Sequence, residues 1–134
     1  MTINDREIIL ITYSTEKNWI ADIPKNNWLC VLVDNDRTRN YMDEVISKII
    51  NNDVCWICCV GESSEKTNDL IENEIQFRRV DIDNLHLPKH NIMTTSYQDF
   101  KEGIWFAIFA ANHEHVDINK VVILDMTDEQ QIAW

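Results

Sequence analysis

Two pairs of aspartates stand where strands are expected to end. Asp34 and Asp36 occur in the stretch DNDRT, directly after one apolar run, and Asp125 and Asp128 occur in LDMTD, at the end of another. An aspartate that follows a buried strand can attack a phosphoryl group, and neighbouring carboxylates can transfer a proton or hold Mg²⁺. With this chemistry, Asp34 would be the nucleophile, Asp36 the general acid/base, and the second pair the metal ligands.

The stretch DNDRT resembles the first motif of the haloacid dehalogenase superfamily, and VVILDMTD loosely resembles its acidic last motif. That resemblance implies a small Mg²⁺-dependent phosphatase. The chain departs from the pattern because a helical segment begins directly after Thr38, which leaves no room for a flap over the site. Neither aspartate has a glycine beside it. We therefore favour a simpler interpretation, in which Asp36 caps the following helix and Asp34 neutralises Arg37, and we keep the phosphatase as the alternative.

Cysteines and histidines offer little further chemistry. Cys55 and Cys58 have the Cys-x-x-Cys spacing of redox and zinc sites, but residues three apart on a strand point to opposite faces. We expect reduced, buried thiols. The histidines of HLPKH and HEH have no convincing third and fourth zinc ligand. The sequence therefore predicts no catalytic residue, no metal and no cofactor.

The apolar pattern predicts the elements that would position these residues. Five nearly continuous apolar runs, typical of parallel strands covered on both faces, occur at residues 7–13, 28–33, 54–60, 91–95 and 121–124. Helical spacing occurs within residues 37–52, 64–79 and 98–114, with a short final helix at 128–133, and residues 14–27 form a loop or a short edge strand. Strand–helix–strand crossovers require parallel strands. We predict one α/β domain over residues 1–134, a three-layer α/β/α sandwich with a mainly parallel sheet of about five strands.

The third predicted helix is apolar most of the way round, which predicts deep burial. Gly103 in its interior indicates close packing, and Asp99 with Glu102 has the spacing of a capping box.

Charge excludes several kinds of partner. The chain has 23 acidic and 12 basic residues, a formal net charge of −11, which repels nucleic acid and anionic membranes and attracts basic proteins. Only two glycines are present, although phosphate-binding loops need them. No apolar run reaches the roughly 20 residues of a membrane span, and the acidic N-terminus is unlike a signal peptide. We expect a cytoplasmic protein that binds neither nucleic acid nor membrane.

Acidic side chains gather at the predicted carboxyl ends of the strands and along the second helix. Parallel α/β sheets bind ligands and partners at that edge. Tyr97 and Trp134 belong to no core stripe and could anchor a partner. The predicted partner-binding residues are Asp34, Asp36, Glu62, Glu65, Asp69, Glu72, Tyr97, Asp125, Asp128 and Trp134.

The stretches VCWICCVGESSEKTNDLIEN and NIMTTSYQDFKEGIWFAIFAA resemble the pattern of a small bacterial family. Size and acidity are similar to those of immunity proteins from contact-dependent growth inhibition systems. This resemblance, over about Trp28 to Met126, implies a monomer that binds one toxin domain in a 1:1 complex. That toxin would be a cationic nuclease such as an RNase, whose active site the acidic surface covers. A further alternative is an oligomeric scaffold that associates through the apolar third helix.

Overall fold

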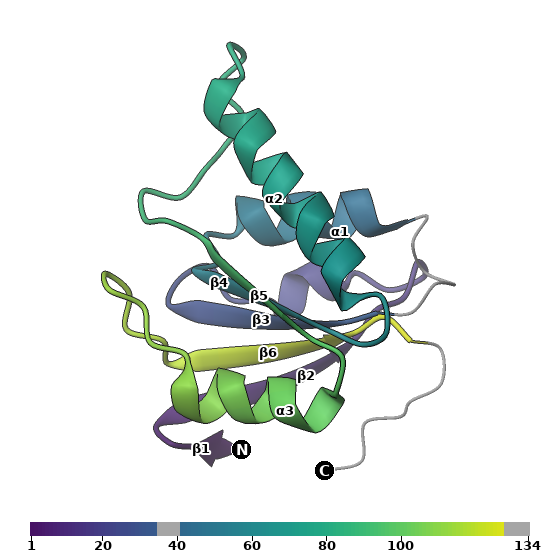
Figure 1. The fold of residues 1–134 in the computed structure, drawn as a ribbon, viewed down its shortest axis with the longest axis vertical. Helices are drawn as coiled ribbons and strands as arrows, with labels where there is room; N and C mark the ends of the chain where they lie inside the picture. The colour runs from purple at the N-terminus through teal and green to yellow at the C-terminus, as the bar shows by residue number, and fades with distance from the viewer. Residues whose placement is uncertain (35–40, 128–134) are drawn as a thin grey trace.

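The computed structural model describes residues 1–34 and 41–127 of the chain. These residues form a mixed α/β fold around one six-stranded sheet, with helices packed against both of its faces (Figure 1). Strand order across the sheet is β1-β2-β6-β3-β4-β5. Only β1 is antiparallel to its neighbour, and β2, β6, β3, β4 and β5 run parallel to one another.

The strands are β1 (Thr2–Ile3), β2 (Arg6–Thr12), β3 (Trp28–Val33), β4 (Trp56–Val60), β5 (Met93–Tyr97) and β6 (Lys120–Asp125). The helices are the 3₁₀ helix η1 (Trp19–Asp22), α1 (Met42–Asn51), α2 (Ser64–Val80), α3 (Phe100–Trp105) and the π-helical turn η3 (Phe106–Ala110), which continues α3. All five predicted strands are present as β2 to β6, with ends that agree to within two residues. Three of the predicted helices are present as α1, α2 and α3 with η3.

Three features differ from the sequence prediction or fall outside the structure. A sixth strand, β1, pairs with β2 through a turn at Asn4 and Asp5, whose φ angles of 55° and 59° suit a tight hairpin. Residues 14–27 hold no edge strand, and the buried Trp19 instead starts η1. The predicted final helix at 128–133 lies outside the described residues.

One face of the sheet packs against α1 and α2. Strand residues whose side chains point to this face include Cys30, Leu32 and Ile57, and all three are buried. From the helices, the cluster takes five buried side chains of α1 and two of α2: Met42, Val45, Ile46, Ile49, Ile50, Ile71 and Ile75. Spacing of three and four residues puts all of them on the inner side of their helices, as the sequence predicts.

The opposite face packs against α3 and η3. Asp99 accepts a hydrogen bond from the backbone N–H of Glu102 (3.2 Å), which confirms it as the cap of α3. A Cβ at Gly103 would lie 2.5 Å from Val60 Cγ2, so the helix backbone lies directly on β4. The predicted deep burial of this helix is wrong, because Trp105 is 59% exposed and Phe109 is 51% exposed. Only one side of the helix faces the sheet.

Arg78 ties three segments of the chain together. Its side chain is 4% exposed. The guanidinium donates to Ser47 Oγ and Asn51 Oδ1 on α1, to the carbonyl oxygen of His86 in the loop after α2, and to Glu74 Oε2, over 2.8 to 3.0 Å. A buried cation bonded in this way fixes α2 against α1 and against the loop that contains His86.

We predict that Arg78→Ala lowers the free energy of unfolding by about 3 kcal/mol, because it leaves several buried acceptors without their donor. The matched variant Arg79→Ala removes the neighbouring arginine, whose side chain is exposed, and should change stability by about 0.5 kcal/mol or less. Urea unfolding followed by circular dichroism measures both. Equal effects of the two substitutions would contradict a structural role for Arg78.

Candidate functional site

The carboxyl ends of five strands lie in one row. The strand register aligns Thr12, Asp125, Val33, Val60 and Tyr97 across β2, β6, β3, β4 and β5. Asp34 and the loop containing Glu62 follow directly after this row. The parallel sheet thus gathers the predicted acidic edge from segments that are far apart in the sequence.

Asp34 lies inside the protein at this edge. The residue is 5% exposed, and its Oδ2 accepts a hydrogen bond of 2.5 Å from Thr67 Oγ1 on α2. The main chain of Asp34 also sits against Gly61, which has a φ of +124°, and a Cβ there would lie 2.7 Å from the Asp34 carbonyl oxygen. Asp34 therefore joins β3 to the start of α2 and offers little surface to a partner.

Asp125 is also internal. It is 2% exposed, and its Oδ1 accepts hydrogen bonds from the backbone N–H and the hydroxyl of Thr127, at 2.9 and 2.6 Å. Asp36, Asp128 and Trp134 lie outside the described residues. Within residues 1–34 and 41–127, no three His, Cys, Asp or Glu side chains gather to hold a metal ion. One magnesium ligand of the phosphatase hypothesis, Asp125, is described by the structure and the other, Asp128, is not. That hypothesis therefore stays a prediction.

Acidic side chains at the surface begin just before α2 and continue along one side of the helix. We call Glu62, Glu65, Asp69 and Glu72 the acidic stripe, and all four are exposed. Glu65, Asp69 and Glu72 are four and three residues apart, which aligns them along one side of the helix. Lys66 is the one basic residue within this span. The stripe gives α2 a concentrated negative charge at the end nearest the strand termini.

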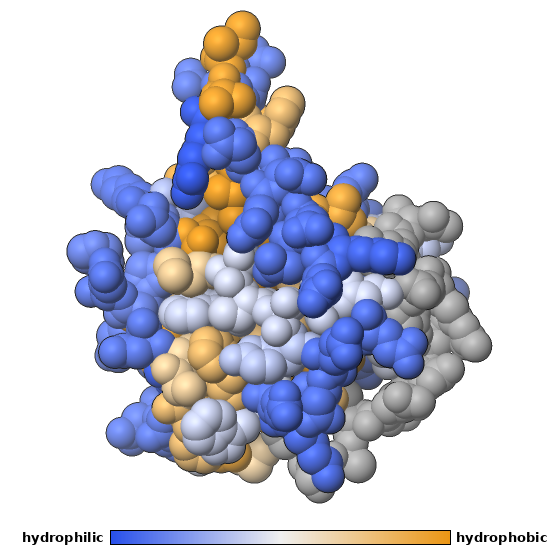
Figure 2. Space-filling view, in the orientation of Figure 1, coloured by the Kyte–Doolittle hydropathy of each residue, from blue (hydrophilic) through white to orange (hydrophobic). Residues whose placement is uncertain are grey.

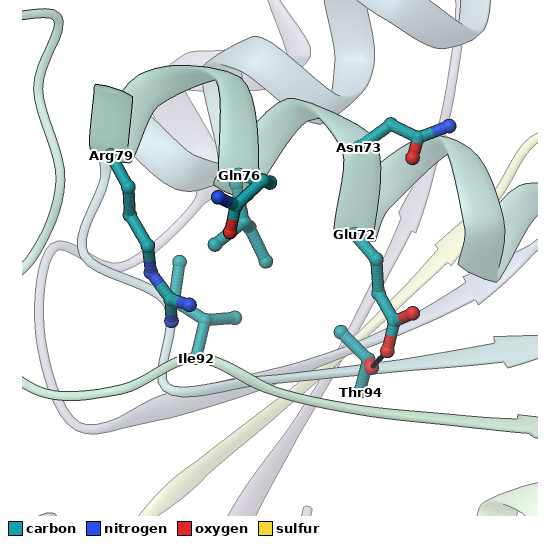
Figure 3. A pocket seen from close by; sticks show the side chains of 7 residues that line it. Glu72, Asn73, Gln76, Arg79, Ile92 and Thr94 are labelled. Atoms are coloured by element: carbon teal, nitrogen blue, oxygen red, sulfur yellow. Dashed lines mark hydrogen bonds between the residues drawn. The ribbon is translucent and has the colours of Figure 1, made fainter. Parts of the chain in front are cut away.

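A groove separates α2 from β5. Its lining includes Glu72, Gln76 and Arg79 on the helix, and Ile92 and Thr94 below them. Figure 3 shows the three helix side chains pointing toward Ile92 and Thr94, and a hydrogen bond of 2.9 Å joins Thr94 Oγ1 to Glu72 Oε1. We call this cavity of about 380 Å³ the α2 groove.

A second groove lies on the other side of β5, against α3. It measures about 370 Å³ and is lined by Tyr97, Lys101, Glu102, Trp105 and Phe106. The rings of Tyr97 and Phe106 are in contact, with centroids 5.4 Å apart, and burial raises the pKa of the Tyr97 phenol. We call this the α3 groove. Tyr97, which the sequence suggested as a partner anchor, lines it at the end of β5.

The end of α2 and the following loop expose a group of large apolar side chains: Phe77, Val80, Ile82 and Leu85. We call them the apolar tip, and Ile82 is 90% exposed. Figure 2 shows orange atoms at the end of the projection that α2 and this loop form. Sequence analysis missed these residues. The signal available in the sequence was the helical spacing of Leu70, Ile71 and Ile75. Phe77 and Val80 do not follow that spacing.

The four cysteines are free and buried, as expected. Cys55 and Cys58 nevertheless belong to the same core cluster, on the α3 face. The strand argument that separated them is therefore wrong, because β4 begins at Trp56 and Cys55 precedes it. Burial raises the pKa of Cys55 to about 12 and that of Cys58 to about 11. Such thiols stay protonated and make poor nucleophiles or metal ligands.

Histidine rings meet at the other end of the sheet. His113 is buried, its Nε2 bonds the Asn91 carbonyl oxygen (2.7 Å), and its Nδ1 accepts the backbone N–H of His115 (3.0 Å). His113 therefore closes the loop after η3 as a structural residue.

We predict that Thr67→Val destabilises the protein by about 2 kcal/mol, because the buried Asp34 carboxylate loses a hydrogen-bond donor while side-chain shape is kept. Thr94→Val is the matched control. It removes an exposed hydrogen bond to Glu72 and should cost about 0.5 kcal/mol or less. Urea unfolding would contradict this account of Asp34 if the two variants were equally stable.

We also predict that an aromatic disulfide reagent at pH 8 leaves the native thiols unmodified and titrates all four after unfolding in guanidinium. Raised pKa values and burial both suppress attack, since the thiolate is the reactive form. Thr15→Cys places a thiol at an exposed position and should react at once. Fast labelling of any thiol in the native wild-type protein would contradict the conclusion that all four cysteines are buried.

No helix in the described part of the chain is long and apolar enough to cross a membrane. Residues 8–133 match the model of a family described as "Domain of unknown function (DUF7684)", so the chain belongs to that family. Neither the curated proteins nor the solved structures contain a match to this chain.

Proposed function

We propose that this member of the DUF7684 family is an immunity protein of the contact-dependent growth inhibition type. It binds a cognate nuclease toxin domain, such as an RNase, and covers its cationic active site. The observation that carries this proposal is the exposed acidic stripe on α2 in a chain of net charge −11. The protein acts in the cytoplasm as a monomer and forms a 1:1 complex with the toxin.

Electrostatics supports a basic partner. A nuclease binds its substrate through Lys and Arg side chains that neutralise phosphates. Carboxylates presented at phosphate-like spacing compete for those side chains and raise the association rate. Glu62, Glu65 and Asp69 are exposed, so their charges reach a partner through water, whereas Asp34 and Asp125 contribute only from beneath the surface.

Affinity requires apolar contacts as well, because charge pairs act mainly on association rate and specificity. The acidic stripe begins just before α2 and the apolar tip ends just after it, and the helix between them is about 25 Å long. One partner surface of ordinary size can cover both. Phe77 and Val80 are therefore proposed anchors, together with Tyr97 and with Trp134, which lies outside the described residues.

The proposed frame is the three-layer α/β/α sandwich expected from the sequence. Ile71 and Ile75 of α2 belong to the core cluster on one face of the sheet, so the helix is held in place as a support for the stripe. Preorganised surfaces lose little conformational entropy on association. Asp36 and Asp128 remain proposed contacts at the adjoining edge.

We predict that Glu62→Lys, Glu65→Lys and Asp69→Lys together weaken binding of the toxin domain encoded beside this gene by about 100-fold. Most of the loss should lie in the association rate, and added salt should reduce the wild-type rate toward that of the variant. Surface plasmon resonance at two salt concentrations measures the rates, and an RNA cleavage assay measures inhibition.

The matched control reverses three exposed acids elsewhere, Asp22, Glu114 and Asp117, to lysine. It changes net charge equally and should retain near wild-type affinity. If both triple variants bound equally well, overall charge alone would act and the stripe would not be the contact surface. If the wild-type protein failed to bind at low salt, the proposed function would be wrong.

A further inference from the structure

β5 is the open edge of the sheet. It pairs with β4 on one side and ends the strand order on the other. The Met93 N–H donates to the Cys55 carbonyl oxygen, and the Tyr97 carbonyl oxygen accepts from the Gly61 N–H, so these residues bond inward. Because inward and outward residues alternate along a strand, the backbone N–H and C=O groups of Thr94 and Ser96 point outward.

Side chains of β5 alternate between the two faces of the sheet, and each face has a groove beside the strand: Thr94 lines the α2 groove and Tyr97 lines the α3 groove. Thr94 faces α2, where it bonds Glu72, and Thr95 faces the α3 side, where its Oγ1 accepts from Trp56 Nε1 at 3.2 Å. The α2 groove and the α3 groove therefore flank the same edge, and they are of nearly equal volume. Figure 2 shows pale, weakly polar atoms along β5 across the middle of this face, with blue atoms over α2.

Native proteins usually protect an edge strand with charges, proline or a bulge. The sequence of β5, MTTSY, has none of these charges and no proline, and its residues are all at least partly exposed. An unprotected edge with a groove on either side is the geometry that accepts another strand.

We propose that an extended segment of the partner adds to β5 as a further strand of the sheet. The backbone of this segment forms hydrogen bonds with the backbone of Thr94 and Ser96, and its alternate side chains enter the two grooves. The inference rests on the function proposed above. Side chains that enter the α2 groove are basic or polar and meet Glu72. Those that enter the α3 groove are apolar and pack against Trp105, Phe106 and the ring of Tyr97.

The acidic stripe favours a cationic segment as the occupant, because it adjoins the α2 groove, while the lining of each groove holds one acid and one base. On the α2 side, Glu65, Asp69 and Glu72 lead to the groove, and Arg79 stands at its far end, about 10 Å along the helix from Glu72 (Figure 3). On the α3 side, the groove is lined by Lys101 and Glu102. Two copies of this chain, each of net charge −11, would repel one another across such an edge.

The test uses a fluorescent peptide of about eight residues in which Lys and Val alternate, close to a usual strand length. Anisotropy measures its affinity, and hydrogen exchange measures protection of the Thr94 and Ser96 amides. Ser96→Pro removes an outward N–H and blocks the edge, and should weaken binding at least tenfold. Ser96→Ala keeps the backbone and should stay within twofold of wild type.

Two further peptides keep the inference testable if Ser96→Pro fails to fold. A peptide with N-methyl groups on one backbone edge should bind the wild-type protein at least tenfold more weakly. A peptide with the same composition in blocks of Lys and Val should also bind weakly, because its side chains do not alternate. Equal binding of all three peptides would show electrostatic attraction without strand addition and would overturn the proposal.

Sedimentation and toxin binding give the remaining outcomes. If sedimentation showed that the wild-type protein is a dimer and that Ser96→Pro makes it a monomer, the edge would bind a second copy of this chain. That result would overturn the proposal. Undiminished toxin inhibition by a folded Ser96→Pro variant would remove β5 from the interface while leaving the immunity function intact. If the wild-type protein did not bind the toxin, the proposed function itself would be wrong.

Discussion

Burial of the central strands on both faces is the constraint on which the structure depends. Every residue of β3 and β4 is buried, and so are all but the first of β6. Such strands are apolar along most of their length, and they need helices on both sides to exclude water from the sheet. Polar chemistry is thereby restricted to strand ends, outer helix surfaces and the free edge at β5.

The polar residues near the strand ends have two different physical roles. Asp34 and Asp125 are internal, and each carboxylate is bonded to a threonine hydroxyl. Burying a charge without such partners would cost several kcal/mol, so these contacts are a condition of the fold. The side chains of the acidic stripe are exposed, so burial places no such constraint on them. Their position suits the proposed cationic partner, and Glu65 in the first turn of α2 also interacts favourably with the helix dipole.

Backbone and side chains contribute differently to the proposed interface. An open strand edge offers the same N–H and C=O groups to any extended chain, so it gives affinity without selectivity. In the proposed complex, the α2 groove selects by charge and the α3 groove by shape and apolarity. The same proposal gives the acidic stripe the role of accelerating encounter before either groove is filled.

The sequence by itself determined the five long strands, the inner stripe of α1, the cap at Asp99 and the excess of negative charge. These are local properties: apolar runs, helical spacing and side chains that bond their own backbone. The tertiary structure decided which aspartates are buried, which side of α3 meets water, that Cys55 and Cys58 share a face, and that β5 lies at an edge flanked by two grooves. Burial and edges depend on which distant segments become neighbours, and residue types and spacing along one chain do not specify that pairing.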